Sequence, residues 1–176
     1  MDATNLADLY GLPVVDWERV VARLDRGLEL DPETAGPRPN TCWLATMNGD
    51  GSPHVTGVGA LWVAGTFYFT TGERTRKGRN LARDPRCSLS LATDEFDLVV
   101  DGNAALVDDP AVVADTAGRW ADQGWPASPD KTGIALTAEY SAPSAGAPPW
   151  RVYRLPPRQA TVVLAAAPGG ATRWRF

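Results

Sequence analysis

The sequence has few of the residues that build metal sites and disulfides. Its 176 residues include two cysteines, Cys42 and Cys87, and one histidine, His54. Two thiols and one imidazole do not make a convincing tetrahedral zinc site, so we expect no bound metal. Both cysteines lie in apolar segments, where a buried free thiol is more common than a disulfide.

Long apolar runs are also absent. No stretch approaches the roughly 20 apolar residues that a membrane-spanning helix needs, which excludes such a helix. The chain starts with the acidic and polar residues Asp2, Thr4, Asn5 and Asp8 instead of a basic start and an apolar stretch. A secretory signal requires both features, so the sequence predicts a cytoplasmic protein.

Positive charge is scarce overall, with 17 basic against 21 acidic side chains and a net charge of −4. Nucleic acids and anionic membrane surfaces attract proteins that present a summed positive field. The composition therefore argues against both partners and leaves a small-molecule substrate as the expected one. The length suits one domain over residues 1–176 with a core of its own.

The N-terminal part of the chain predicts a helix followed by a linker, together residues 1–39. Apolar residues recur between positions 12 and 30 at the spacing of one helix face: Trp17, Val20, Val21, Leu24 and Leu28. Residues 31–40 contain three prolines and a glycine, which favour a loop.

The rest of the chain predicts a mainly β fold. Segments rich in β-branched and aromatic residues alternate with turn signals, and they predict about eight short strands: 41–47, 53–64, 66–71, 87–93, 97–107, 150–155, 160–166 and 172–176. Most of them follow one another as hairpins. This order favours a closed or split antiparallel barrel with a few peripheral helices over a parallel sheet.

Two peripheral helices interrupt the strands. The first is predicted over residues 72–85, with a cap at Thr71 or Gly72 and a stop at Pro85. The second begins at Asp109 and Pro110 and runs to about Gln123.

Seven of the fifteen prolines lie between positions 126 and 157. We therefore interpret residues 126–149 as a proline-rich excursion over a site, within the same domain.

The most informative segment is a basic cluster that contains one acid, Asp84. Its six members are Arg74, Arg76, Lys77, Arg79, Arg83 and Arg86. Guanidinium and ammonium groups at the start of a helix suit a phosphate, and one cluster in an acidic protein suits a single phosphorylated cofactor. A solvated helix face is the alternative that composition alone leaves open.

These segments resemble a known family. The hairpin of residues 41–69, the segment 70–91 and the terminal TRWRF resemble the pyridoxamine 5′-phosphate oxidase-like split-barrel family, in particular its flavin/deazaflavin oxidoreductase branch. The resemblance covers residues 41–108 well. It implies an antiparallel split β-barrel and a homodimer with two equivalent cofactor grooves between the subunits.

The resemblance also implies where the cofactor binds. Arg76, Lys77 and Asn80 would hold its phosphate, with Arg74 and Arg79 as helpers. The ring system would be lined by one strand at His54, Val55, Thr56 and Gly57, and by the end of another at Thr70 and Thr71. At the C-terminus, Trp174 and Arg175 would reach a cofactor face on the same or the partner subunit.

The spacing of residues 76–81, RKxRNL, resembles members that use the deazaflavin coenzyme F-420 more than members that use FMN. The implied activity is hydride transfer to a small conjugated substrate. An FMN-dependent oxidoreductase and a non-catalytic flavin-binding protein remain alternatives. Arg83 and Arg86 could extend a basic track toward the acidic tail of F-420. No acid–base pair stands out, so the sequence leaves the catalytic residues unassigned.

The aromatic residues and the histidine have simpler interpretations. Most of the tryptophans favour core or dimer-interface packing over cofactor stacking: Trp43, Trp62, Trp120 and Trp125. For Trp150 and Trp174 the two interpretations are closer. His54 at the start of a strand is interpreted as a solvent-facing or hydrogen-bonded residue and not as a catalytic base.

Overall fold

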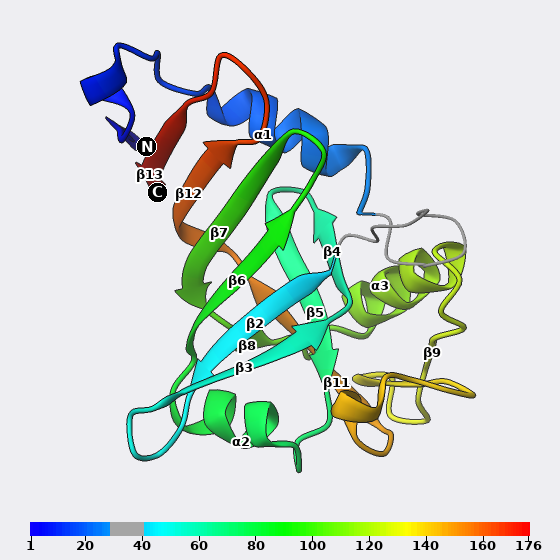
Figure 1. The fold of residues 1–176 in the computed structure, drawn as a ribbon. Coiled ribbons are helices and arrows are strands. Elements are labelled where there is room, and N and C mark those ends of the chain that lie inside the picture. Colours follow the sequence, from blue (N-terminus) through cyan, green and yellow to red (C-terminus); the bar gives the residue numbers. More distant parts are fainter. Residues whose placement is uncertain (29–40) are drawn as a thin grey trace.

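The computed structural model describes residues 1–28 and 41–176 (Figure 1). Its strands are β1 (Asp2–Asn5), β2 (Cys42–Met47), β3 (Pro53–Val58), β4 (Ala60–Val63), β5 (Thr66–Thr71), β6 (Arg86–Ala92), β7 (Phe96–Asn103), β8 (Ala105–Leu106), β9 (Ser128–Pro129), β10 (Ala135–Thr137), β11 (Trp150–Leu155), β12 (Pro157–Leu164) and β13 (Ala171–Arg175). The helices are α1 (Trp17–Asp25), α2 (Arg76–Arg83) and α3 (Pro110–Asp122), with short 3-10 turns η1 (Asp8–Tyr10) and η2 (Pro143–Ala145).

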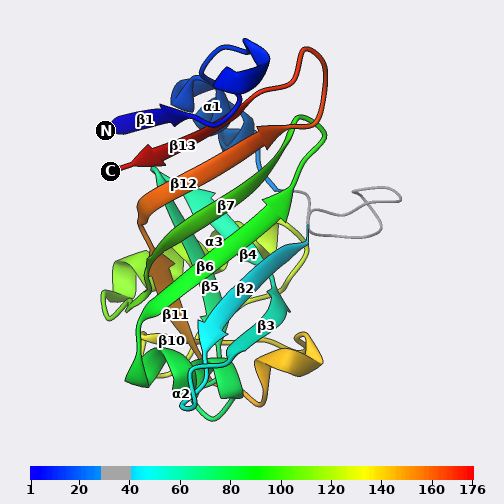
Figure 2. The same cartoon turned by 60° about the vertical axis from the view of Figure 1, so that its left-hand side comes forward.

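The strands form two antiparallel sheets that curl around a common core, which confirms the predicted mainly β split barrel. One sheet has the order β1-β13-β12-β7-β6-β2-β3, and the other has the order β4-β5-β11-β10-β9 with β8 beside β11. Helix α1 lies across one end of the barrel and α2 across the opposite end, while α3 lies beside the smaller sheet (Figures 1 and 2).

The main core fills the space between the sheets. In the larger sheet Leu44, Leu89 and Val100 lie opposite one another on adjacent strands and are fully buried. They contact the inner side chains Phe67 and Phe69 of β5 in one apolar cluster. Such a row from three strands is what the alternation of apolar and polar residues predicts for a sheet with one buried face.

A smaller core lies under α3 and the proline-rich segment. It includes Val113 and Trp120 of α3 and Leu136, Trp150 and Val152 from the strands below. The segment 126–149 is thereby tied to the barrel through β9, β10 and η2. The short strands and the 3-10 turn of this segment were not predicted, and its role as an excursion over a site stays a prediction.

Several predicted boundaries were wrong. Helix α1 begins after Asp16, whose side chain accepts a hydrogen bond from the Glu18 N–H, so it starts later than position 12. The predicted strand 53–64 is two strands, because the chain passes from the larger sheet to the smaller one at Gly59. The N-cap of α2 is Thr75, so Thr71 ends β5 and does not cap the helix.

The N-terminus carries a strand that the sequence did not signal. β1 pairs with β13, with Asp2 opposite Arg175, which extends the larger sheet by one edge strand. Most of the predicted linker, and the predicted end of the first helix, fall at residues 29–40 and lie outside the described residues.

Helix α3 and both cysteines agree with prediction. The Asp109 side chain accepts a hydrogen bond from the Ala111 N–H, Pro110 follows it, and the helix ends next to Gln123. Cys42 and Cys87 are buried free thiols, and burial raises the pKa of each to about 12. Within residues 1–28 and 41–176, no helix is long and apolar enough to cross a membrane.

Candidate functional site

The turn between β5 and α2 fixes the start of the basic cluster. The Thr75 hydroxyl donates to the Gly72 carbonyl oxygen at 2.8 Å and accepts from the Gly78 N–H at 3.0 Å. A Cβ on Gly78 would lie 2.4 Å from the Gly72 oxygen, so only glycine allows this close approach. The tight turn sets the direction in which the first-turn residues Arg76 and Lys77 leave the helix.

Lys77 points into the protein. Its side chain is only 2% exposed, and its Nζ donates a hydrogen bond to the Ser144 carbonyl oxygen at 2.5 Å. Burial lowers the pKa of this ammonium below its usual value, because the charged form loses hydration. Among the residues that the structure describes, this cation has one acceptor, and that acceptor is neutral; a bound anion would complete the arrangement.

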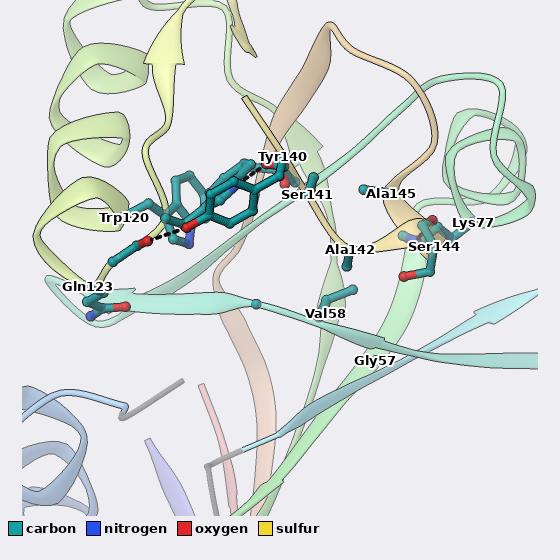
Figure 3. A pocket seen from close by; sticks show the side chains of 14 residues that line it. Gly57, Val58, Lys77, Trp120, Gln123, Tyr140, Ser141, Ala142, Ser144 and Ala145 are labelled. Atoms are coloured by element: carbon teal, nitrogen blue, oxygen red, sulfur yellow. Dashed lines mark hydrogen bonds between the residues drawn. The ribbon is translucent and has the colours of Figure 1, made fainter. Parts of the chain in front are cut away.

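The Lys77 side chain lines a pocket of about 280 Å³ (Figure 3). One wall is the end of β3, Gly57 and Val58 with the following Gly59. The facing wall comes from the end of α3 and from the proline-rich segment. Its lining residues are Trp120, Gln123, Gly124, Trp125, Tyr140, Ser141, Ala142, Ser144 and Ala145, and Thr70 of β5 completes the pocket.

The aromatic wall is held by hydrogen bonds that cross between the two segments. The Trp125 indole N–H donates to the Tyr140 carbonyl oxygen at 2.6 Å, and the Tyr140 hydroxyl donates to the Gly124 carbonyl oxygen at 2.9 Å. The Trp125 ring also contacts those of Trp120 and Trp150, with centroids 5.7 and 5.6 Å away. The end of α3 and residue 140 are thereby joined in one wall.

Three of the predicted cofactor residues meet in this pocket: Gly57, Thr70 and Lys77. His54 lies half-buried on β3, and its pKa is lowered by partial burial and by the positive charges of Arg76 and Lys77.

Other predicted cofactor residues have partners within the protein or point elsewhere. Asn80 is buried and donates to Thr46 Oγ1 and Asn48 Oδ1, both at 3.1 Å. Thr71 is buried and hydrogen-bonded to Thr75. Val55 is exposed. Thr56 follows Val55 on β3 and is half-buried, because successive side chains of a strand point to opposite faces.

The C-terminal pair lies away from the pocket within one protomer. Trp174 is 1% exposed and packs against Trp17 in the main core, with ring centroids 5.1 Å apart. Arg175 is exposed and lies opposite Asp2 and Gln159 in the larger sheet. A role for Trp174 and Arg175 at a partner's site stays a prediction.

The remaining arginines of the cluster differ in their contacts. Arg79 donates to the Arg74 carbonyl oxygen, and Arg83 donates to the Met47 carbonyl oxygen. Arg86 forms an ion pair with Asp84 at 2.7 Å. Hydrogen bonds from Arg86 are the main reason why the pKa of Asp84 is lowered to about 2. Arg76 is exposed. Over the described residues, its guanidinium has no hydrogen bond or ion pair.

Sequence reasoning missed most of the second wall. Trp120 and Trp125 were interpreted as packing residues, and they both pack and line the pocket. Gln123, Tyr140 and Ser144 carried no motif. The only signal was the density of prolines in residues 126–149, which predicted an ordered or partly mobile excursion over a site without naming its residues.

The pocket fits a planar ring with an anionic group. The glycines of the β3 end offer a wall with little side-chain bulk, the indoles and the phenol form an apolar face, and the Lys77 ammonium supplies one positive end. Its volume is close to the lower end of the range for small-molecule sites. A flavin-type ring with a phosphate has this combination of shape and charge.

Comparison with known structures supports the fold. A putative 5-nitroimidazole antibiotic resistance protein from Bacteroides thetaiotaomicron is 12% identical, with a TM-score of 0.59 over 99% of this chain and 93% of that one. A protein related to general stress protein 26 from Clostridium acetobutylicum is 12% identical, with a TM-score of 0.58 over 92% and 97%. A putative pyridoxamine 5′-phosphate oxidase from Listeria innocua is 18% identical, with a TM-score of 0.54 over 82% and 95%.

No curated protein sequence matches the chain significantly. The sequence profile described as pyridoxamine 5′-phosphate oxidase matches residues 33–143, which is more than half of the chain and includes β2 to β10. This match agrees with the resemblance of residues 41–108 and with the split barrel. The chain therefore belongs to the pyridoxamine 5′-phosphate oxidase family.

Proposed function

We propose that this chain is a coenzyme-dependent oxidoreductase that binds the deazaflavin F-420 in the Lys77 pocket of a homodimer and transfers hydride to a small conjugated substrate. The observation that carries the proposal is the buried Lys77 ammonium, which faces a pocket with a slim strand wall and an aromatic wall. Family membership supports flavin-type redox chemistry, and the substrate and the choice of coenzyme are part of the proposal.

The coenzyme phosphate would be held by Lys77 and Arg76. An ammonium has three N–H donors, and Ser144 accepts one of them; no other residue of the described ranges accepts from Lys77, so two donors would be left for phosphate oxygens. Arg76 is exposed beside it and can add a guanidinium from the same helical turn. Asn80, which was predicted to contact the phosphate, would instead fix α2 to Thr46 of β2 and to Asn48 in the turn that follows.

When bound, the coenzyme supplies a hydride from a carbon of its reduced ring. The protein supplies position and a dry surface. The strand residues Gly57 and Val58 and the indole of Trp125 line the pocket, and the Tyr140 hydrogen bonds hold the aromatic wall together. Exclusion of water strengthens the electrostatic contact with Lys77 and protects the hydride from side reactions.

One observation favours FMN as a second candidate. The arginines that could guide the acidic tail of F-420 past the phosphate are Arg83 and Arg86, and both are engaged, with Met47 and Asp84 respectively. FMN has no such tail and needs no basic track. Against this, the spacing of residues 76–81 resembles that of F-420 users.

The homodimer is supported by the outer face of the larger sheet. Trp43 is 50% exposed and Val99 is 39% exposed, and both lie opposite Ser90 in the strand register, so they point to the same side. Val55 and Val163 are further exposed apolar residues on the same sheet. Apolar side chains gathered on one sheet face are typical of a surface that another subunit covers.

The first test is coenzyme binding. The visible spectrum of the purified protein, followed by equilibrium titration with F-420 and with FMN, should show binding of F-420 below about 100 μM, or about −5.5 kcal/mol. Turnover with enone or quinone substrates would then separate an enzyme from a coenzyme store. Failure of both coenzymes to bind would refute the redox function.

A further inference from the structure

The pocket wall contains a buried polar atom that no residue of the described ranges satisfies. Gln123 Oε1 is buried, and within residues 1–28 and 41–176 it has no hydrogen-bond partner. Gln123 also lines the Lys77 pocket. A buried acceptor without a donor is costly, so such atoms are rare in folded proteins and each of them needs an explanation.

The backbone around Gln123 is fixed, so its side chain leaves from a defined point. Gln123 is the C-cap of α3, and its N–H donates to the Trp120 carbonyl oxygen at 3.1 Å. Gly124 follows in the left-handed region at φ +91°, and the Trp125 N–H closes the turn on the same Trp120 oxygen at 3.0 Å. This helix end also carries the aromatic wall.

Gln123 and Lys77 lie on opposite sides of the pocket (Figure 3). Between them are the strand wall at Gly57 and Val58 and the aromatic residues Trp120 and Tyr140. A ligand that spans the pocket therefore meets an ammonium at one end, apolar surfaces in the middle and a primary amide at the other end.

We propose that Gln123 is a specificity-determining residue that recognises the cyclic imide edge of the coenzyme ring. Flavins and deazaflavins share this edge, in which a ring N–H lies beside carbonyl oxygens. A primary amide accepts through its oxygen and donates through its nitrogen, so it can match the N–H and one neighbouring carbonyl together. The bond would satisfy the buried Oε1 and fix the orientation of the ring. The inference rests on the proposed function and is independent of which coenzyme binds.

The test compares FMN with an FMN analogue methylated on the imide nitrogen, which lacks the N–H donor. Both probes are titrated by fluorescence into the wild-type chain, Gln123→Leu and the control Asp122→Leu. Asp122 is exposed and precedes Gln123 on α3. The wild type and the control should bind FMN about tenfold more tightly than the methylated analogue. Gln123→Leu should bind FMN about tenfold more weakly and bind both probes equally well.

Three results would overturn the inference, and they differ in whether the proposed function fails as well. If the wild type binds FMN but Gln123→Leu keeps both the affinity and the preference, Gln123 does not recognise the imide and the proposed function is unaffected. If the wild type binds neither FMN nor F-420, the proposed function and this inference fail together. A variant that loses affinity for both probes equally, with the preference intact, would indicate a structural role and would also overturn the inference.

Discussion

Replacing Lys77 by methionine should weaken coenzyme binding without weakening the fold. Lys77 is 2% exposed, and among the described residues its ammonium has one hydrogen-bond partner, the Ser144 carbonyl oxygen. Methionine is unbranched and flexible, so it can fill most of the same space without a charge. The variant therefore isolates what the charge contributes.

Loss of the Lys77 charge should lower the affinity for the coenzyme but should not lower the stability of the empty protein. A hydrogen bond to a charged group contributes about 1.5–3 kcal/mol, so loss of the phosphate contact should weaken FMN or F-420 binding by about 10- to 150-fold. In the empty protein, removal of a buried cation also removes its desolvation cost, and exposed Ser144 can hydrate its carbonyl. The free energy of unfolding should stay within about 1 kcal/mol of the wild type, or rise.

The assay combines titration with urea unfolding. FMN and riboflavin, which lacks the phosphate, are titrated into the wild type, Lys77→Met and Lys131→Met. Lys131 is the other lysine of the sequence and is exposed, so its replacement is a matched control for lost charge. The preference for FMN over riboflavin should fall by about 10- to 150-fold in Lys77→Met and stay unchanged in Lys131→Met, with Arg76 still in place in both variants. A variant that keeps this preference, but unfolds at much lower urea concentration, would show that Lys77 is structural and would refute the reasoning.

Three further predictions follow from pKa, packing and surface. Because burial lowers the pKa of Lys77, coenzyme affinity should fall as pH rises through a range below the usual lysine pKa of about 10.4. In the same pH range the stability of the empty protein should rise, since the unfolded chain binds more protons than the folded one. A coenzyme affinity that does not change with pH across that range would contradict this prediction. Gly78→Ala should lower the free energy of unfolding by about 1–3 kcal/mol in urea, because its Cβ would lie 2.4 Å from the Gly72 oxygen, and an unchanged midpoint would argue against this packing. Trp43→Glu should shift the protein from dimer to monomer in sedimentation velocity, and a monomeric wild type would exclude the proposed dimer.

The fold was predictable from the sequence because its main signals are local. Alternating residues in β2, β6 and β7 place Leu44, Leu89 and Val100 on one buried face, and Asp109 with Pro110 marks the start of α3. The boundaries that failed depend on distant partners. β1 exists because it pairs with β13 at the other end of the chain, and nothing within residues 2–5 indicates that pairing.

The site was only half predictable for the same reason. The Arg76 and Lys77 pair and the strand at Gly57 carry a recognisable pattern, and the structure brings Gly57 and Lys77 together. The facing wall comes from segments without such a pattern. Gln123 and Tyr140 reach the pocket because α3 ends there and the proline-rich segment folds back over β3. These are tertiary contacts, which one sequence does not reveal.

The most direct test of the account is a crystal structure of the chain with F-420 or FMN bound. We expect the coenzyme phosphate within hydrogen-bond distance of Lys77 Nζ, and the ring between the strand wall at Gly57 and the indole of Trp125. A phosphate bound away from α2, or a ring that lies outside this pocket, would contradict the account.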